Sequence, residues 1–199
     1  MKKVLFVNGC IRGEQSRTLR LARRLISHIP DAEIEVLSLP ALHPAPLDAD
    51  TILQRDTLAA AKAFHLPFFA LANQFKNADA VVLACPYYDL TVPALVRAYL
   101  EHLCVIGLTF HYNEQGYPVG DCKPQRLLYV TTRGGLVDNA DPALADHASA
   151  YLRSLCAVLG VDRFDCLAAE GLDITGVDQE ALLRKAETQA DTVAAAFWN

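Results

Sequence analysis

The sequence predicts a doubly wound α/β fold, in which a five-stranded parallel sheet with strand order 2-1-3-4-5 carries helices on both faces. The first reason is alternation, because five short apolar segments alternate along the chain with segments of helical periodicity. The second is that Lys3–Val7 and Ala80–Ala84 are continuously apolar, as strands covered on both faces are. Five strands favour this order over the six-stranded dinucleotide order, and it places a ligand crevice where strands 1 and 3 diverge.

The amino-terminal half follows this alternation. The first strand leads through a loop into a helix at Thr18–His28, where apolar residues recur at helical spacing and Ser16 is placed to cap the helix. Glu33–Leu39 alternates polar and apolar residues, which predicts a half-exposed edge strand. After a proline-rich connection, Thr51–Lys76 is helical but interrupted near Pro67, so it is either two helices or one kinked helix.

The carboxyl-terminal half repeats the pattern. The third strand is at Ala80–Ala84. After the fourth strand, a helix begins at Asp141 or a neighbour, with Pro142 in its first turn, and ends at Gly160. The other elements are a helix at Pro93–Val105, an irregular excursion at Gly107–Asp121, the fourth strand at Arg126–Thr131, the fifth at Phe164–Ala169 and a closing helix at Asp178–Phe197.

Composition predicts a single domain, residues 1–199, that is large enough to bury a core without disulfides or metals. A formal charge of −5 with no basic stripe argues against nucleic acid or a membrane surface as partner. The apolar run Val4–Val7 is too short for a secretory signal, and no run approaches the ~18 apolar residues of a membrane span, so we expect a cytoplasmic protein. The six cysteines form no CxxC and no zinc spacing, so we expect reduced, mostly buried thiols and no metal.

The loop from Cys10 to Thr18 follows the first strand. It matches neither GxGxxG nor GxxxxGK[ST], which argues against a dinucleotide fingerprint and a Walker A loop. Ser16, Arg17 and Thr18 stand where a helix starts, and their hydroxyls, free backbone N–H groups and the positive end of the helix dipole suit a single phosphate. An ordinary helix cap explains the same residues equally well.

The loops after the third and fourth strands have the composition of a ligand shelf. Tyr87, Tyr88, Asp89 and Leu90 offer flat apolar surface and backbone polar groups to an aromatic ring, unless the tyrosines only cover the end of the sheet. Thr132–Gly135 ends in two glycines, which either let the backbone approach a ligand or make a tight turn. Because all three loops follow strand carboxyl ends, we expect them to meet at one edge and to accommodate a phosphate, a ring edge and a ring face.

Two stretches carry a family resemblance. CPYYDLTVPALVRAYLEHLCVIGLTFHY (Cys85–Tyr112) and VTTRGG (Val130–Gly135) resemble the P-x-Y-N-F-x-(I/V)-P-A-x-L-K, G-x-T-F-x-Y and (S/T)-R-G-G motifs of the FMN-dependent NADH-azoreductase / NAD(P)H:quinone reductase family. The spacing also fits at the amino end and at Ala169–Gly171, so the match covers essentially the whole chain. The resemblance implies a flavodoxin-like fold, FMN at a homodimer interface, and ping-pong hydride transfer from NADH or NADPH through the flavin to a quinone, azo compound or similar acceptor.

The resemblance also implies site residues. The FMN phosphate would meet Ser16, Arg17 and Thr18, with Cys10 at a position that is usually serine, and Tyr112 matches an aromatic residue that the family uses near the ring from the partner subunit. No side chain is expected to act as an obligate general base, because the cofactor carries the hydride chemistry. The ring would lie along Pro86, Tyr87, Tyr88, Asp89 and Leu90 and against Thr132, Arg133, Gly134 and Gly135.

Three residues depart from the family pattern. Asp89 replaces asparagine, and a carboxylate beside the flavin disfavours negative charge on the reduced ring and lowers its redox potential. Leu90 replaces a common phenylalanine, and Cys10 replaces a hydroxyl. Cys10 and Cys85 end neighbouring strands, so they are either a redox-sensitive pair or, as the simpler interpretation, two unreactive small residues.

An alternative function is an FMN-binding electron carrier or regulatory module without nicotinamide turnover. Small flavodoxins usually carry a T-x-T-G-x-T phosphate loop and a strongly acidic face, and this chain has neither. A receiver domain needs an acidic pair after the first strand and an aspartate at the third, where this chain has Asn8 and Cys85. The sequence therefore favours the enzyme.

Overall fold

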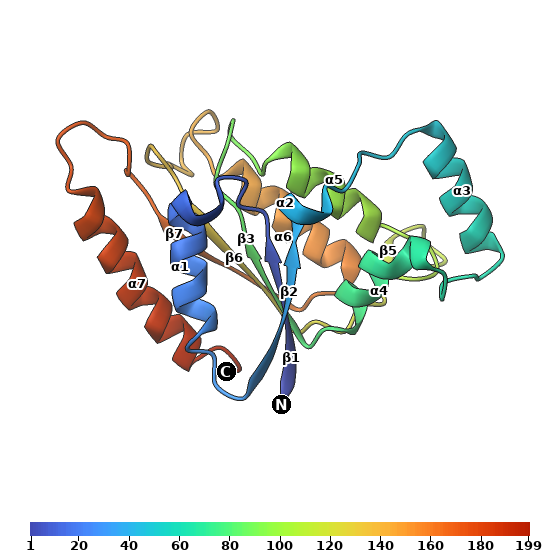
Figure 1. Cartoon of the computed structure of the whole chain (residues 1–199). Coiled ribbons are helices and arrows are strands. Elements are labelled where there is room, and N and C mark those ends of the chain that lie inside the picture. The colour runs from blue at the N-terminus through green and yellow to red at the C-terminus, as the bar shows by residue number, and fades with distance from the viewer.

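The structure is a computed structural model that describes residues 1–199, and Figure 1 shows how its elements are arranged. Five parallel strands form one sheet in the order β2-β1-β3-β6-β7. Since β6 and β7 are the fourth and fifth strands of this sheet along the chain, the predicted order 2-1-3-4-5 is confirmed. The strands are β1 (Lys2–Asn8), β2 (Ala32–Ser38), β3 (Ala80–Ala84), β6 (Arg126–Thr132) and β7 (Arg163–Ala169).

Helices flank the sheet on both sides (Figure 1). The principal ones are α1 (Arg17–Ile26), α4 (Ala70–Asn77), α5 (Ala94–Leu103), α6 (His147–Leu159) and α7 (Gln179–Ala195). Side chains alternate between the faces of a strand, so Val4 and Phe6 of β1 pack in the cluster with α1 and α7, whereas Leu5 and Val7 pack in the cluster with α4, α5 and α6. The central strands β1, β3 and β6 are therefore buried on both faces, as their apolar sequences predict, whereas the edge strands β2 and β7 are partly exposed.

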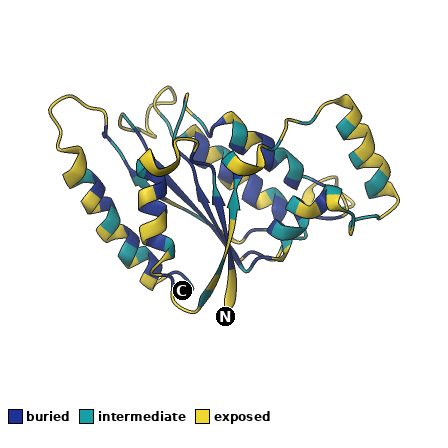
Figure 2. Ribbon diagram, viewed as in Figure 1, coloured by how far each residue is buried: buried dark blue, intermediate teal, exposed yellow.

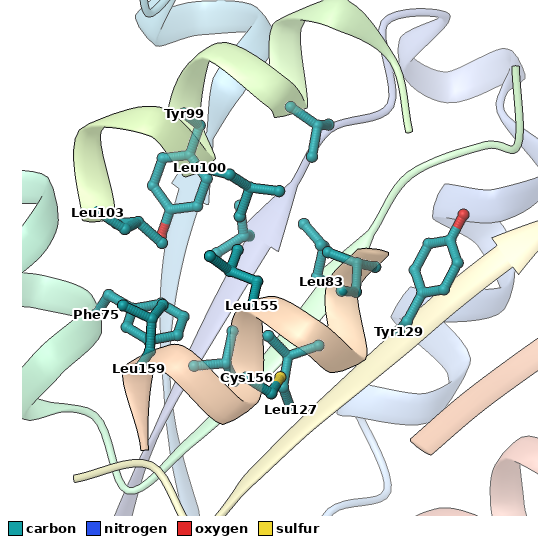
Figure 3. Close-up of a cluster of buried hydrophobic side chains, with 14 of the residues drawn as sticks. Phe75, Leu83, Tyr99, Leu100, Leu103, Leu127, Tyr129, Leu155, Cys156 and Leu159 are labelled. Atoms are coloured by element: carbon teal, nitrogen blue, oxygen red, sulfur yellow. The ribbon is translucent and has the colours of Figure 1, made fainter. Parts of the chain in front are cut away.

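The cluster that contains α4, α5 and α6 holds one buried polar group without a partner. Figure 3 shows Tyr99 in this cluster, together with Leu103 of the same helix, Phe75 of α4 and Leu159 of α6. The hydroxyl of Tyr99 has no hydrogen-bond partner, and burial raises the pKa of this phenol. A buried hydroxyl that has lost its water and gained no partner destabilises the folded state.

The stretch predicted as helical at Thr51–Lys76 contains two separate helices, α3 (Ala49–Ala60) and α4, so the two-helix interpretation is confirmed. After the short α2 (Leu39–Leu42), α3 has no buried residue and projects from the body of the molecule, as Figures 1 and 2 show. A 3-10 turn, η2 (Pro67–Phe69), then leads into α4 at the predicted proline. None of the helices is both long enough and apolar enough to cross a membrane.

The excursion after α5 is more regular than predicted. It contains an antiparallel hairpin of two three-residue strands, β4 (Phe110–Tyr112) and β5 (Pro118–Gly120), which are too short to give a clear alternation in the sequence. A Cβ atom at Gly120 would lie only 1.9 Å from the backbone nitrogen of Gly160, so the absence of a side chain lets the hairpin dock against the end of α6.

Helix α6 begins later than predicted, at His147 rather than near Asp141. Asp146 is its cap, since the carboxylate accepts the N–H of Ser149 at 2.8 Å and the hydroxyl of Ser149 at 2.5 Å. Upstream, Asp141 accepts the N–H of Ala143 at 2.9 Å and forms a turn instead of a helix start. The prediction was wrong because several aspartates in this segment can each satisfy local N–H groups.

Candidate functional site

A polar cleft of about 160 Å³ opens at the carboxyl ends of β1, β3 and β6. The structure thus brings together the three loops that the sequence predicted to meet. The walls of the cleft come from those three loops and from the segment after β7. The lining residues are Arg12, Gln15, Ser16, Arg17, Thr18, Pro86, Tyr87, Tyr88, Thr132, Gly134 and Asp173.

The loop after β1 turns into a helix at the cleft. A 3-10 turn, η1 (Gly13–Gln15), is followed by Ser16, whose Oγ accepts the N–H of Leu19 at 3.2 Å and caps α1. The N–H groups of Arg17 and Thr18, at the first two helical positions, have no intrahelical acceptor and lie at the cleft wall. Ser16 is therefore an ordinary cap, and the cap leaves anion-binding N–H groups at the cleft.

Two predicted members of the first loop have their polar atoms occupied within the protein. The hydroxyls of Thr18 and Thr132 lie 2.6 Å apart and tie α1 to the end of β6. Cys10 is 1% exposed and does not line the cleft, because its Sγ donates to the carbonyl of Ala84 at 3.6 Å. Burial raises the pKa of Cys10 to about 11 and that of Cys85 well above its ordinary value, so neither thiol ionises readily. Both are free thiols, which favours two unreactive small residues over a redox pair.

The glycine pair after β6 is held against the segment after β7. The carbonyls of Gly134 and Gly135 accept the N–H groups of Asp173 at 2.9 Å and Gly171 at 3.0 Å. A Cβ at Gly134 would come within 2.5 Å of Asp173 Oδ2, whereas a Cβ at Gly135 would meet no atom within 4 Å. The N–H groups of both glycines make no hydrogen bond within the chain. Gly134 lines the cleft and its N–H remains available to a ligand there, whereas Gly135 is exposed and does not line the cleft, contrary to the sequence prediction.

The loop after β3 is a strained two-residue turn. Tyr88 and Thr91 exchange two backbone hydrogen bonds, of 3.1 and 2.9 Å, around Asp89 and Leu90. Both central residues have positive φ, 49° and 67°, as in the type I′ hairpin turn that asparagine and glycine prefer. Leucine is unfavourable there because its Cβ crowds the backbone. Asp89 lines an adjoining apolar groove with Ile11 rather than the cleft itself, and Leu90 lines neither.

Tyr87 links the loops after β3 and β6. Its N–H donates to the carbonyl of Thr132 at 3.3 Å, and its hydroxyl donates to the carbonyl of Ala145 at 3.2 Å. Burial raises the pKa of this phenol, so Tyr87 stays neutral as a donor at physiological pH. The Arg133 guanidinium lies 5.0 Å from the centre of the Tyr87 ring. The position of Tyr87 in the cleft wall is therefore fixed at its backbone by Thr132 and at its hydroxyl by Ala145.

Arg133 does not line the cleft, although the sequence placed it among the ligand contacts. Its side chain is 4% exposed and forms ion pairs with Asp146, the cap of α6, and with Glu170 at 2.6 Å. Its backbone N–H donates to the carbonyl of Ala169 at 2.9 Å. Burial acts to lower the pKa of Arg133, but the nearby carboxylates outweigh it and the pKa is raised. Arg133 thus joins the ends of β6, β7 and α6 behind the cleft.

Tyr112 is also outside the cleft of its own chain. It lies on β4, it is 55% exposed, and its ring packs edge-on against that of Phe110 with centroids 5.6 Å apart. This position fits the expectation that Tyr112 acts on a second copy of the chain rather than on its own cleft.

The sequence did not single out Arg12, Gln15 or Asp173, which also line the cleft. Arg12 and Gln15 fall inside the predicted phosphate loop, so a search of every polar residue in that loop would have found them. Asp173 is two residues beyond the Ala169–Gly171 motif, and only the fold reveals that this segment closes the cleft.

Comparison with known proteins defines the family. Residues 2–193 match the model of a protein family described as flavodoxin-like fold. The FMN-dependent NADH:quinone oxidoreductase of Lachnoclostridium phytofermentans is 31% identical over 207 aligned residues, which cover 99% of this chain and 100% of that protein. The chain belongs to this flavodoxin-like family. The family resemblance and the fold class predicted from the sequence are both confirmed.

Further members of the flavodoxin-like family agree. The FMN-dependent NADH:quinone oxidoreductase 2 of Clostridium acetobutylicum is 32% identical over 200 residues, covering 96% of this chain and 98% of that protein. The crystal structure of azoreductase from Bacillus anthracis str. Sterne superposes with a TM-score of 0.85 and 26% identity, covering 99% of this chain and 100% of that one. The match therefore extends over both chains from end to end.

Proposed function

We propose that this protein is an FMN-dependent NAD(P)H oxidoreductase that passes hydride through the flavin to a quinone, an azo compound or a similar acceptor. Residues 1–199 act as a single FMN-binding domain. The observation that carries the proposal is the meeting, in one cleft, of a helix amino terminus, an aromatic shelf and Gly134 with a free N–H group. The activity named for the full-length relatives supports it.

The groups in the cleft fit FMN chemically. Arg12 and the free N–H groups at the start of α1 suit a phosphate, and the loop that contains Tyr87 and Tyr88 suits a ring system. Pockets that enclose whole ligands are typically ~300–1,000 Å³, whereas this cleft is about 160 Å³. It would therefore enclose only the phosphate end of FMN, and the ring would lie on the open shelf, where donor and acceptor could both reach it.

FMN, when bound, supplies the hydride chemistry that no side chain in the cleft provides. The free N–H of Gly134, in the cleft wall, would stabilise negative charge on a ring bound there, and the free N–H of Gly135 is the next donor along the chain. Asp89, on the turn that borders the adjoining groove, would oppose that charge. The cleft would present one open ring face to donor and acceptor in turn, so we expect ping-pong kinetics.

We also propose that the enzyme is a cytoplasmic homodimer and that Tyr112 of each copy reaches the ring bound by the other. The exposure of Tyr112 and its position outside its own cleft support this role.

The test is to record the visible spectrum of the purified protein and then to add NADH with menadione. The proposal predicts a flavin absorption band and menadione reduction that depends on FMN. A colourless protein that gains no activity when FMN is supplied contradicts it. A flavin-containing protein that is never reduced by NADH or NADPH would be the electron carrier or regulatory module instead.

A further inference from the structure

We propose that Arg12, and not Arg17, supplies the positive charge that binds the cofactor phosphate and selects FMN over uncharged riboflavin. This inference rests on the FMN-binding function proposed above. It assigns the role to a residue that the sequence did not single out, and it removes the guanidinium of Arg17 from the predicted phosphate contacts.

The charge of Arg17 is already matched within the protein. Its Nη2 lies 2.9 Å from Asp173 Oδ1, and its Nη1 donates to the carbonyl of Leu172 at 3.2 Å. Such a partly exposed pair contributes little to stability. It nevertheless directs the guanidinium toward the segment after β7 and cancels its charge at the cleft wall. Arg17 then offers its backbone N–H, rather than its side chain, to a ligand.

Arg12 is the cation of the cleft that has no partner. Its side chain makes no ion pair and no hydrogen bond, although it lines the same cleft. The acidic residue of its own loop, Glu14, is engaged elsewhere, because both carboxylate oxygens bind Arg23 of α1, one of them at 2.6 Å. With Arg17 and Asp173 cancelling, Arg12 leaves the cleft with one net positive charge.

Few hydroxyl donors compete for the phosphate role. Cys10 donates its thiol to a backbone carbonyl, and the hydroxyl of Thr18 is bonded to that of Thr132. The neutral donors that remain are the backbone N–H groups at the start of α1, the amide of Gln15 and the hydroxyl of Ser16, and Arg12 is the charged donor. A guanidinium can hold two phosphate oxygens at once, which a lysine ammonium does with poorer geometry.

The experiment measures the affinities of FMN and riboflavin for the apo-protein by quenching of flavin fluorescence. Arg12→Met should weaken FMN binding roughly ten- to a hundredfold, as loss of a charged hydrogen bond does, and leave riboflavin affinity unchanged. Arg12→Lys should recover part of the loss. The FMN affinity of the wild type should also fall with added salt more steeply than that of Arg12→Met, because a charge pair is screened.

Two further variants separate Arg12 from other cations. The double variant Arg17→Met with Asp173→Asn removes the internal pair and keeps the net charge of the cleft, so its FMN affinity should fall much less than that of Arg12→Met. Lys123→Met removes an exposed charge just before β6, at the amino ends of the strands and so opposite the cleft. It should leave FMN affinity unchanged. Circular dichroism melts establish that every variant is folded.

The assignment is overturned if Arg12→Met binds FMN as the wild type does, if it loses FMN and riboflavin equally, or if the double variant loses as much as Arg12→Met. In each case the wild-type protein still binds FMN, so the proposed function stands. A wild-type protein that binds neither flavin overturns both the assignment and the function.

Discussion

The loops after β1 and β6 each place an arginine beside the same cleft, and the two arginines are in opposite states. Arg12 is exposed and its side chain has no partner. Arg133 is 4% exposed, is paired with Asp146 and Glu170, and lies over the ring of Tyr87. A buried charge is stable only when it is compensated. The two ion pairs of Arg133 satisfy this need and connect the elements behind the cleft, so its role is structural. An exposed cation without a partner is free to meet a ligand.

The largest predicted difference is in stability. Arg133→Met leaves two carboxylates without their partner, one of them nearly buried, so it should lower the free energy of unfolding by about 3 kcal/mol or more. Arg12→Met should change it by less than about 0.5 kcal/mol, because an exposed side chain without contacts is lost. Urea unfolding followed by circular dichroism measures both. Equal changes in the free energy of unfolding would contradict the distinction between a structural Arg133 and a ligand-binding Arg12.

Tyr99 extends the comparison to a buried polar group that lacks a partner. Tyr99→Phe removes a hydroxyl that makes no hydrogen bond, so it should raise the free energy of unfolding by about 1 kcal/mol. The matched control is Tyr87→Phe, which removes a hydroxyl bonded to Ala145 and should destabilise the protein. Thermal melts of both variants give the signs, and a destabilised Tyr99→Phe would mean that its hydroxyl has a partner after all.

Asp89 tests whether a charge near the cleft changes the redox potential of bound FMN without changing the stability of the protein. Asp89→Asn removes a negative charge near the proposed ring site, and it should raise the midpoint potential of bound FMN by about 30 mV, as expected for one partly screened charge. Its effect on unfolding should stay below about 0.5 kcal/mol. Redox titration with a reference dye measures the potential. An unchanged potential would place Asp89 away from the ring.

The smallest predicted effect concerns acid and the β1 loop. Hydrogen bonding to Arg23 holds the pKa of Glu14 below its ordinary value of 4.5. A carboxylate with a lowered folded pKa stabilises the protein above its ordinary pKa, and this contribution disappears as the pH falls through the folded value. Glu14→Gln should therefore show a slightly shallower loss of stability below about pH 4.5. Salt should reduce the difference because the pair is exposed. An identical pH profile would show that the pair contributes nothing.

The sheet and the meeting of its loops were predictable because they depend on periodicity and topology. Continuous apolar runs such as Ala80–Ala84 identify buried strands, and the strand order then brings the loops to one edge. The hairpin at Phe110–Gly120 was missed because three-residue strands carry too little pattern. The start of α6 was misplaced because Asp141 and Asp146 are both able to cap.

The roles of the cleft side chains were less predictable than their positions. The motif that contains Arg133 places it at the end of β6, but the sequence does not tell on which side its side chain leaves the strand. That direction depends on Asp146 and Glu170, which come from two other elements. In the same way, Arg17 is paired with Asp173, more than a hundred residues away in the sequence. The local sequence therefore suggests a free positive charge at Arg17, although the fold neutralises it.

The central claim is that the cleft at the ends of β1, β3 and β6 binds FMN and presents it to a nicotinamide. An anaerobic titration of the apo-protein with FMN, followed in the same cuvette by NADH and then menadione, tests this claim directly. The account predicts saturation at a single FMN per chain, bleaching of the visible flavin band by NADH, and its return with menadione. Failure to saturate, or a bound flavin that NADH and NADPH leave oxidised, would contradict the account.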